Sequence, residues 1–178
     1  LPWDKIHIFQ VDERIAPDGD KDRNLTHLRD ALSSQTALPP DHIHAMPVEA
    51  PDLSHAARDY AQTLEGLAGA PPVLDLIHLG LGADGHTASL VPGDQALDVN
   101  DADVATTRPY QGHNRMTLTF PVINRARRIL WLVTGGEKAN ALARLNDGDR
   151  SIPAGRVRRD EALILADAAA AKQLGAAQ

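Results

Sequence analysis

A glycine-rich segment in the middle of the chain carries residue types suited to acid–base chemistry. Gly80-Leu81-Gly82-Ala83-Asp84-Gly85-His86 places a carboxylate and an imidazole two residues apart. A neutral imidazole takes a proton from water readily near neutral pH, because its unperturbed pKa is about 6.5. Glycines allow the backbone to approach a ligand closely. The segment predicts a site where His86 accepts a proton and Asp84 orients the imidazole ring of His86.

The same glycines also satisfy G-x-G-x-x-G, the pattern of dinucleotide-binding loops. That pattern needs a full helix directly after the glycines and, about 20 residues on, an acidic residue at the end of a second strand. Pro92-Gly93 interrupts the chain within about two helical turns of Gly85. Dinucleotide binding is therefore rejected, and the predicted site uses no cofactor.

Cationic side chains follow two other predicted strands. Arg14 comes after the strand pattern at 6–11, and Lys138 comes after the apolar run at 129–134. Loops at the carboxyl ends of parallel strands meet at one edge of a sheet, so both cations can converge on one anion. Arg156 is a third candidate. The alternative for each is a solvated surface charge.

Other polar residues are assigned structural roles. Asp12 and Glu13 are expected to hold the neighbouring arginine in place more than to touch a ligand. His78 lies inside an apolar run and is expected to be a packed, hydrogen-bonded core residue. His42 and His44 form an H-x-H pair without a third ligand in sequence reach, so we predict no metal site.

Strand and helix patterns alternate along the chain, which favours the α/β class. The run at 73–81 is almost continuously apolar and is typical of a strand buried on both faces of a parallel sheet. We predict one domain over 1–178, a three-layer αβα arrangement whose mainly parallel, Rossmann-like sheet has helices on both faces. Strands are expected at 6–11, 43–46, 73–81, 115–120, 129–134 and 162–165, helices from about Asn24, over 53–67 and around 139–143, and 94–114 is the least regular stretch.

Composition and charge narrow the partners. The chain of 178 residues is 43% hydrophobic and 24% charged, which fits a single globular domain. A net charge of -6 argues against nucleic acid and anionic membranes as partners, whereas a small anion needs only a few local cations. The absence of cysteine fits a reducing compartment, so the cytoplasm is expected. The sequence leaves a monomer and a small homo-oligomer open.

One long match identifies a family. Residues 79–93, which read LGLGADGHTASLVPG, closely resemble the signature segment of the 6-phosphogluconolactonases, within the glucosamine-6-phosphate isomerase-like superfamily. The resemblance continues in the family's order over most of the chain. It includes 11–14 with Asn24, 115–121, 133–138 and 153–157.

The resemblance implies an enzyme that hydrolyses 6-phospho-D-glucono-1,5-lactone to 6-phospho-D-gluconate in the oxidative pentose phosphate pathway. His86 would be the general base that activates water, and Asp84 would orient its ring. The residues implied to contact the phosphorylated sugar are Arg14, Asn24, Gly82, Gly85, Lys138 and Arg156.

Three departures from the family pattern affect these expectations. Family members usually begin with a further strand and helix holding a Ser/Gly-rich loop that helps to bind the sugar phosphate. This chain opens directly on Leu1-Pro2-Trp3 and a strand pattern, so we expect the domain to be N-terminally incomplete. Arg23 and Gly155 stand where the family often has serine, which affects local polar contacts but removes no charged group.

Two other functions stay open. An amino-sugar-phosphate isomerase/deaminase of the same superfamily also places Asp-Gly-His after its central strand. That group tends to have a functional glutamate before the next proline, whereas Thr87-Ala88-Ser89-Leu90-Val91-Pro92 contains no carboxylate. A non-catalytic sugar-phosphate-sensing domain of a transcription regulator would need a DNA-binding segment, which 1–178 does not show, and would have no reason to keep Asp84 beside His86.

Overall fold

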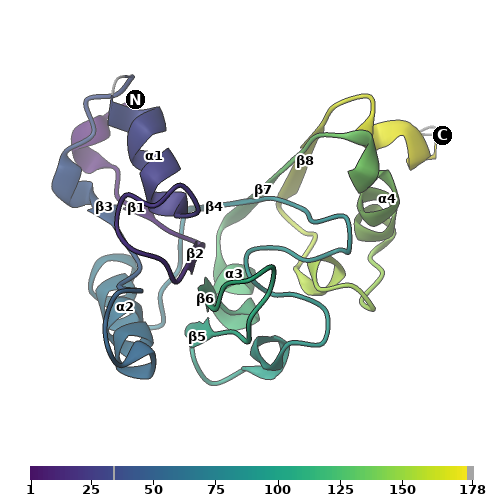
Figure 1. Cartoon of the computed structure of the whole chain (residues 1–178). Coiled ribbons are helices and arrows are strands. Elements are labelled where there is room, and N and C mark those ends of the chain that lie inside the picture. The colour runs from purple at the N-terminus through teal and green to yellow at the C-terminus, as the bar shows by residue number, and fades with distance from the viewer. Residues whose placement is uncertain (34, 176–178) are drawn as a thin grey trace.

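The computed structural model describes residues 1–33 and 35–175 (Figure 1). Its α-helices are α1 (Asn24–Ser33), α2 (Leu53–Ala68), α3 (Phe120–Arg125) and α4 (Ala139–Asp147). Its strands are β1 (Ile8–Phe9), β2 (Asp12–Arg14), β3 (Ile43–His44), β4 (Leu76–Leu79), β5 (Val104–Thr106), β6 (Arg115–Leu118), β7 (Arg128–Val133) and β8 (Ala162–Ala166). Short 3-10 turns are η1 (Trp3–Lys5), η2 (Pro40–His42), η3 (Gln95–Asp98), η4 (Gly136–Lys138), η5 (Ala154–Arg156) and η6 (Ala170–Gln173).

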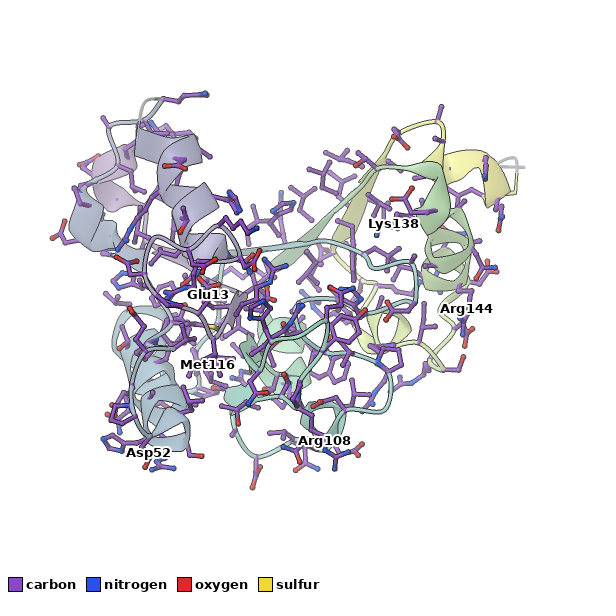
Figure 2. The ribbon with its side chains drawn as sticks, in the orientation of Figure 1. Glu13, Asp52, Arg108, Met116, Lys138 and Arg144 are labelled. Carbon is purple, nitrogen blue, oxygen red and sulfur yellow. The ribbon has the colours of Figure 1, made fainter. Side chains whose placement is uncertain are left out.

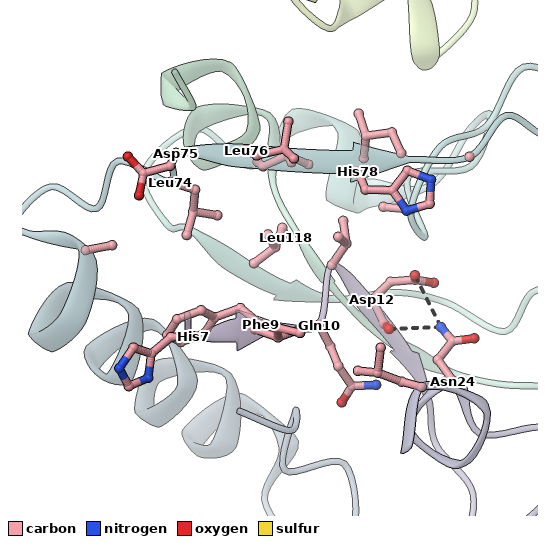
Figure 3. A pocket seen from close by; sticks show the side chains of 18 of the residues that line it. His7, Phe9, Gln10, Asp12, Asn24, Leu74, Asp75, Leu76, His78 and Leu118 are labelled. Atoms are coloured by element: carbon pink, nitrogen blue, oxygen red, sulfur yellow. Dashed lines mark hydrogen bonds between the residues drawn. The ribbon is translucent and has the colours of Figure 1, made fainter. Parts of the chain in front are cut away.

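The strands form three small sheets. β1 pairs with β3 and β4-β7-β8 pair in that order, all in parallel, while β2-β6-β5 is antiparallel. Parallel strands connected through helices confirm the α/β prediction. The division into separate sheets was not predicted. β1 and β4 do not pair with each other, and they line opposite sides of one cavity (Figure 3).

Local signals explain where the two best-defined helices begin and end. The Asp52 side chain accepts a hydrogen bond from the backbone N–H of His55, 2.9 Å away, and so caps the first turn of α2. Gly69 follows its last turn at φ +91°. α4 stops at Gly148, whose φ of +71° is the left-handed conformation that glycine adopts without strain.

The charged triplet Asp12 to Arg14 is a strand, not the polar loop expected. It pairs antiparallel with β6, with Glu13 opposite Met116. The polarity of the side chains was misleading here, because the backbone at Glu13 pairs with Met116, 103 positions away in the sequence. No local pattern reveals such a pairing. β5 lies within the stretch 94–114 that showed no regular pattern, and it completes this sheet.

β4 is covered on one face only. Ile77 and Leu79 are 2% and 1% exposed, whereas Leu76 is 55% exposed and His78 is also exposed. The prediction of a strand buried on both faces was therefore wrong, and so was the prediction of a buried His78. The register places other exposed leucines on the same open face, namely Leu132, Leu163 and Leu165.

The core lies on the opposite face of this sheet. Trp131 of β7 is 1% exposed and packs in one cluster with Leu142 and Leu145 of α4. The same cluster continues through Tyr60 and Leu64 of α2, so it joins the N-terminal elements to the parallel sheet. Among the described residues, none of the helices is both long and apolar enough to cross a bilayer.

Candidate active site

The loop after β4 is a tight turn that holds an acid and a base together. The Gly82 N–H donates to the His86 carbonyl at 2.8 Å, and the Gly85 N–H donates to the Gly82 carbonyl at 2.9 Å. The Asp84 Oδ1 atom then lies 2.6 Å from Nδ1 of His86 and also accepts the His86 backbone N–H at 3.1 Å. We call Asp84 and His86 the dyad.

Both flanking glycines are required by close packing. A Cβ atom on Gly82 would lie 2.1 Å from Nδ1 of His86 and 2.6 Å from Oδ1 of Asp84. Gly85 has φ +84°, and a Cβ there would lie 2.6 Å from Ile152. The N–H groups of these glycines are used inside the turn, so their contribution is the close approach of the dyad to the main chain.

The charge state of Asp84 determines which nitrogen of the His86 ring carries the proton. Burial alone would raise the pKa of this carboxyl, but hydrogen bonds from His86 and from the hydroxyl of Tyr110 outweigh burial and hold the pKa below its usual value. An ionised Asp84 accepts the Nδ1 proton of His86. The lone pair of the ring is then on Nε2, which is the arrangement of a general base.

Two arginines approach the cavity from the antiparallel sheet. Nη1 of Arg14 donates to Oδ1 of Asn24 at 2.7 Å and to the Asp22 carbonyl at 3.2 Å. Arg115 on the neighbouring strand is 4% exposed, and burial together with the charge of Arg14 lowers its pKa. Among the described residues, the buried Nε atoms of both arginines have no hydrogen-bond partner. Both arginines also line the cavity, so their guanidinium groups bring positive charge to its wall.

The part-buried carboxylate of Asp12 connects this sheet to the loop after β4. Oδ2 of Asp12 accepts the Ser89 hydroxyl at 2.6 Å. Asn24 donates its amide to the carbonyl and Oδ1 of Asp12 at 2.9 and 3.3 Å (Figure 3). Burial raises the pKa of Asp12. Asp12 and Asn24 therefore place Arg14 and the loop relative to each other.

Lys138 reaches the same cavity from the parallel sheet. It closes η4, directly after β7, and β7 is the parallel neighbour of β4. The loops after these two strands thus stand at the same end of the sheet. Figure 2 shows Lys138 in the right part of the view and Glu13 in the left part.

One cavity of about 1280 Å³ brings most of the predicted residues together. Its lining also extends down the space between β1 and β4. The predicted residues on its wall are Arg14, Asn24, Gly82, His86 and Lys138, and Arg115 is an addition. Asp84 and Gly85 are not on the wall and reach the site through their contacts with His86 and the turn.

Arg156 lies elsewhere. It is not on the wall of this cavity. Its Nη2 donates to the Leu97 carbonyl at 2.6 Å, and its guanidinium stacks over the Phe120 ring at 4.5 Å. The structure therefore does not bring Arg156 together with the other predicted ligand residues.

Sequence reasoning left three polar residues of the site unassigned. Ser89 and Arg115 lie in segments that match the family, but nothing in their spacing shows that they meet. Tyr110 lies in the irregular stretch and gave no signal at all. Its hydroxyl contacts Asp84 across 26 positions of the chain.

The histidines considered for a metal are stacked on one another. His7 joins His42 and His44, with ring centroids 4.0 and 5.2 Å from its own. Nδ1 of His7 lies 2.9 Å from Nε2 of His44, so these two ring nitrogens contact each other. Over residues 1–33 and 35–175 there is no group of three or more His, Cys, Asp or Glu side chains that could hold a metal ion.

Comparisons with known proteins show the family of this chain. The profile of the family described as glucosamine-6-phosphate isomerases/6-phosphogluconolactonase matches residues 1–165. A 6-phosphogluconolactonase from Synechocystis is 43% identical over 149 residues, which are 82% of this chain and 62% of that protein. One from Nostoc is 37% identical over 182 residues, 98% of this chain and 75% of that protein. The crystal structure of 6-phosphogluconolactonase from Thermotoga maritima superposes with a TM-score of 0.82 at 31% identity, covering 93% of this chain and 74% of that one.

Proposed function

Because the chain belongs to the glucosamine-6-phosphate isomerase/6-phosphogluconolactonase family, we propose that it hydrolyses 6-phospho-D-glucono-1,5-lactone to 6-phospho-D-gluconate, a step of the oxidative pentose phosphate pathway. The chain spans less than two thirds of the length of the Synechocystis relative, 62%. The proposal rests on one observation: His86, which is hydrogen-bonded to Asp84, lines the same cavity as Arg14 and Lys138.

The reaction begins with a water molecule at Nε2 of His86. The imidazole takes a proton as the water oxygen bonds to C1 of the lactone, and the carbonyl oxygen becomes an oxyanion. Asp84 stabilises the imidazolium that forms, through the 2.6 Å contact with Nδ1. When the bond from C1 to the ring oxygen breaks, that oxygen receives the proton from His86.

The phosphate supplies orientation at a distance from the reacting carbon. Arg14 and Lys138 approach the cavity from different sheets, so together they can hold a phosphate from two sides. The buried Arg115 adds a positive charge next to Arg14. Binding energy from a non-reacting group of this kind places the lactone carbonyl near the base.

The direct test is a hydrolysis assay with 6-phosphogluconolactone, corrected for spontaneous ring opening. His86→Gln is expected to lower kcat by about 10²–10⁴-fold, the usual contribution of a general base. His55→Gln is the matched control, since His55 is an exposed helix residue away from the cavity. Near-normal turnover of His86→Gln would show that the proposed mechanism is wrong.

A second assay separates the two enzyme classes of the superfamily. Glucosamine 6-phosphate is supplied to the wild-type chain, and ammonia release is measured. No ammonia is expected, because 87–92 contains no carboxylate to replace the glutamate of the deaminases. Ammonia release without lactone hydrolysis would favour the deaminase.

A further inference from the structure

Among the residues that the structure describes, Tyr110 is the one side chain from outside the loop that hydrogen-bonds to the Asp84 carboxylate. Its hydroxyl donates to Oδ2 of Asp84 at 3.0 Å and lies 3.4 Å from Nδ1 of His86. Its ring stands edge-on to the imidazole, with centroids 5.3 Å apart. The residue begins a tight turn that closes on His113 through an antiparallel bridge.

Arg115 holds the tyrosine in this position. Its guanidinium lies over the Tyr110 ring, 5.0 Å from the centroid, and its Nη2 donates to the Tyr110 carbonyl at 3.3 Å. The same Nη2 donates to Oε1 of Gln111 at 3.5 Å. Because Arg115 is only 4% exposed, the side chain that makes these contacts is itself held by the surrounding protein.

The two oxygens of Asp84 have different partners. Oδ1 takes both hydrogen bonds from His86, and Oδ2 takes the hydroxyl of Tyr110. With only Oδ1 engaged, the carboxylate could rotate and the imidazole could follow it. With both engaged, the plane of the carboxylate is fixed, and the direction of Nε2 is fixed with it.

We propose that Tyr110 is a positioning residue of the proposed lactonase site, whose hydroxyl locks the Asp84 carboxylate so that His86 keeps Nε2 aimed at the attacking water. The inference rests on the proposed function for its kinetic consequence. The contact itself is a property of the folded protein and is measurable without substrate.

The charged groups around the Tyr110 hydroxyl shift its pKa, which can be measured without substrate. Burial, followed by the hydrogen bond and charge of Asp84, raises the pKa of Tyr110 above 10, while the positive charge of Arg115 opposes the rise. Besides Arg115, the ionisable side chains on the cavity wall are Lys5, His7, Asp12, Arg14, His27, Asp75, His78, His86, Arg127 and Lys138.

The chain has two tyrosines, so the variant Tyr60→Phe leaves Tyr110 as the one tyrosine that can ionise. Tyrosinate absorbance in this variant is expected to rise with a midpoint above pH 10. Adding Asp84→Asn is expected to move the midpoint down, because the carboxylate charge is gone. A midpoint that does not respond to Asp84→Asn would show that the contact is absent in solution, and the inference would fail.

The kinetic arm compares Tyr110→Phe with Tyr60→Phe. Tyr60 also donates a buried hydroxyl, to the carbonyls of Gln10 and His44, but it is remote from the dyad and serves as the matched control. Tyr110→Phe is expected to lower kcat about 3- to 10-fold with KM unchanged, as loss of an interaction needed only for the chemical step does. Tyr60→Phe is expected to lower the Tm and leave kcat as in the wild type.

The outcomes separate the two proposals. If Tyr110→Phe lowers the Tm alone and keeps kcat, Tyr110 has a structural role and the inference is overturned. If the wild-type chain hydrolyses no lactone, the proposed function is overturned, and the tyrosinate titration still decides whether Tyr110 locks Asp84.

Discussion

Glu13 and Arg23 form an ion pair from which solvent is almost excluded. The Nε atom of Arg23 lies 3.1 Å from Oε2 of Glu13, and the side chains are 2% and 0% exposed. Glu13 also accepts the backbone N–H groups of Arg14, Asn24 and Leu25. One carboxylate therefore fixes both the strand that carries Arg14 and the start of α1, the structural role that the sequence favoured for it.

Glu13→Gln is expected to reduce the free energy of unfolding by about 3–5 kcal/mol, because it leaves the buried Arg23 guanidinium with only the exposed Glu49 carboxylate, 3.8 Å away, as a counter-charge. Chemical denaturation at pH 7 measures this. Asp18→Asn, which breaks the exposed ion pair with Arg29, is the control and is expected to cost less than about 1 kcal/mol. Equal effects of the two substitutions would contradict the role of burial.

The cost of Glu13→Gln also depends on pH. Burial would raise the pKa of Glu13, but its hydrogen bonds to Gln10, Leu25, Asn24 and Arg14 outweigh it and lower the pKa below the usual value of 4.5. A lowered carboxyl pKa stabilises the fold above the unfolded pKa, and the contribution is lost as the pH falls through the folded pKa. The difference between wild type and variant should therefore shrink in acid.

Gly82→Ala tests the close packing of the dyad on the main chain. The added methyl group would lie 2.1 Å from Nδ1 of His86, so the imidazole must move. We expect kcat to fall at least about 100-fold, in line with the loss of a general base, while circular dichroism stays native. Gly80→Ala adds a methyl group to open space in the same loop and should retain most of the activity. A fully active Gly82→Ala protein would mean that the dyad is not held as described.

Lys138→Met should mainly affect binding of the substrate. A cation that holds the phosphate equally in the ground and transition states changes KM and leaves kcat almost unaltered. The expected increase in KM is about 10-fold or more, since a hydrogen bond to a charged group is worth about 1.5–3 kcal/mol. Lys21→Met, at an exposed lysine outside the cavity, controls for the loss of one positive charge. Steady-state kinetics in which kcat fell and KM did not would exclude a simple phosphate grip.

The stacked histidines predict a pH dependence of stability. Burial first, and then the charges of His7 and His42, lower the pKa of His44 below its ordinary value of 6.5. The unfolded chain therefore binds the proton at a higher pH than the folded chain does, and stability decreases as the pH falls from about 6.5 toward the lowered pKa. Urea unfolding between pH 7 and 5 should show a shallower slope for His44→Gln, with His55→Gln as the control for loss of an exposed histidine.

Local patterns predicted most of the elements that position the site. The helices at Asn24, Leu53 and Ala139 and the strands around Ile77, Trp131 and Leu163 all lie where the sequence patterns placed them. The helices were predictable because their apolar residues repeat with the helical period, and the strands around Ile77 and Trp131 because they are short, nearly continuous apolar runs. The α/β class follows from the alternation of these elements.

Pairing and exposure were not predictable from the same patterns. The strand at Asp12 to Arg14 exists because of a partner distant in sequence, and His78 is exposed because no described part of the chain covers that face of β4. Tyr110 contacts Asp84 through a turn that has no regular period. Each case depends on which segments meet in space, and a periodic pattern carries no such information.

The dyad is built within five consecutive residues, whereas the cations belong to separate sheets. Hydrogen bonds from Gly82 to His86 define the geometry of the loop, and Tyr110 is the contact that braces it from outside. A change in the width of the cavity would therefore alter the proposed binding of a sugar phosphate by the cations and the size of ring that fits. The positions of Asp84 and His86 relative to each other would not change, because the loop holds both, so substrate selectivity can change without a change in the proposed base.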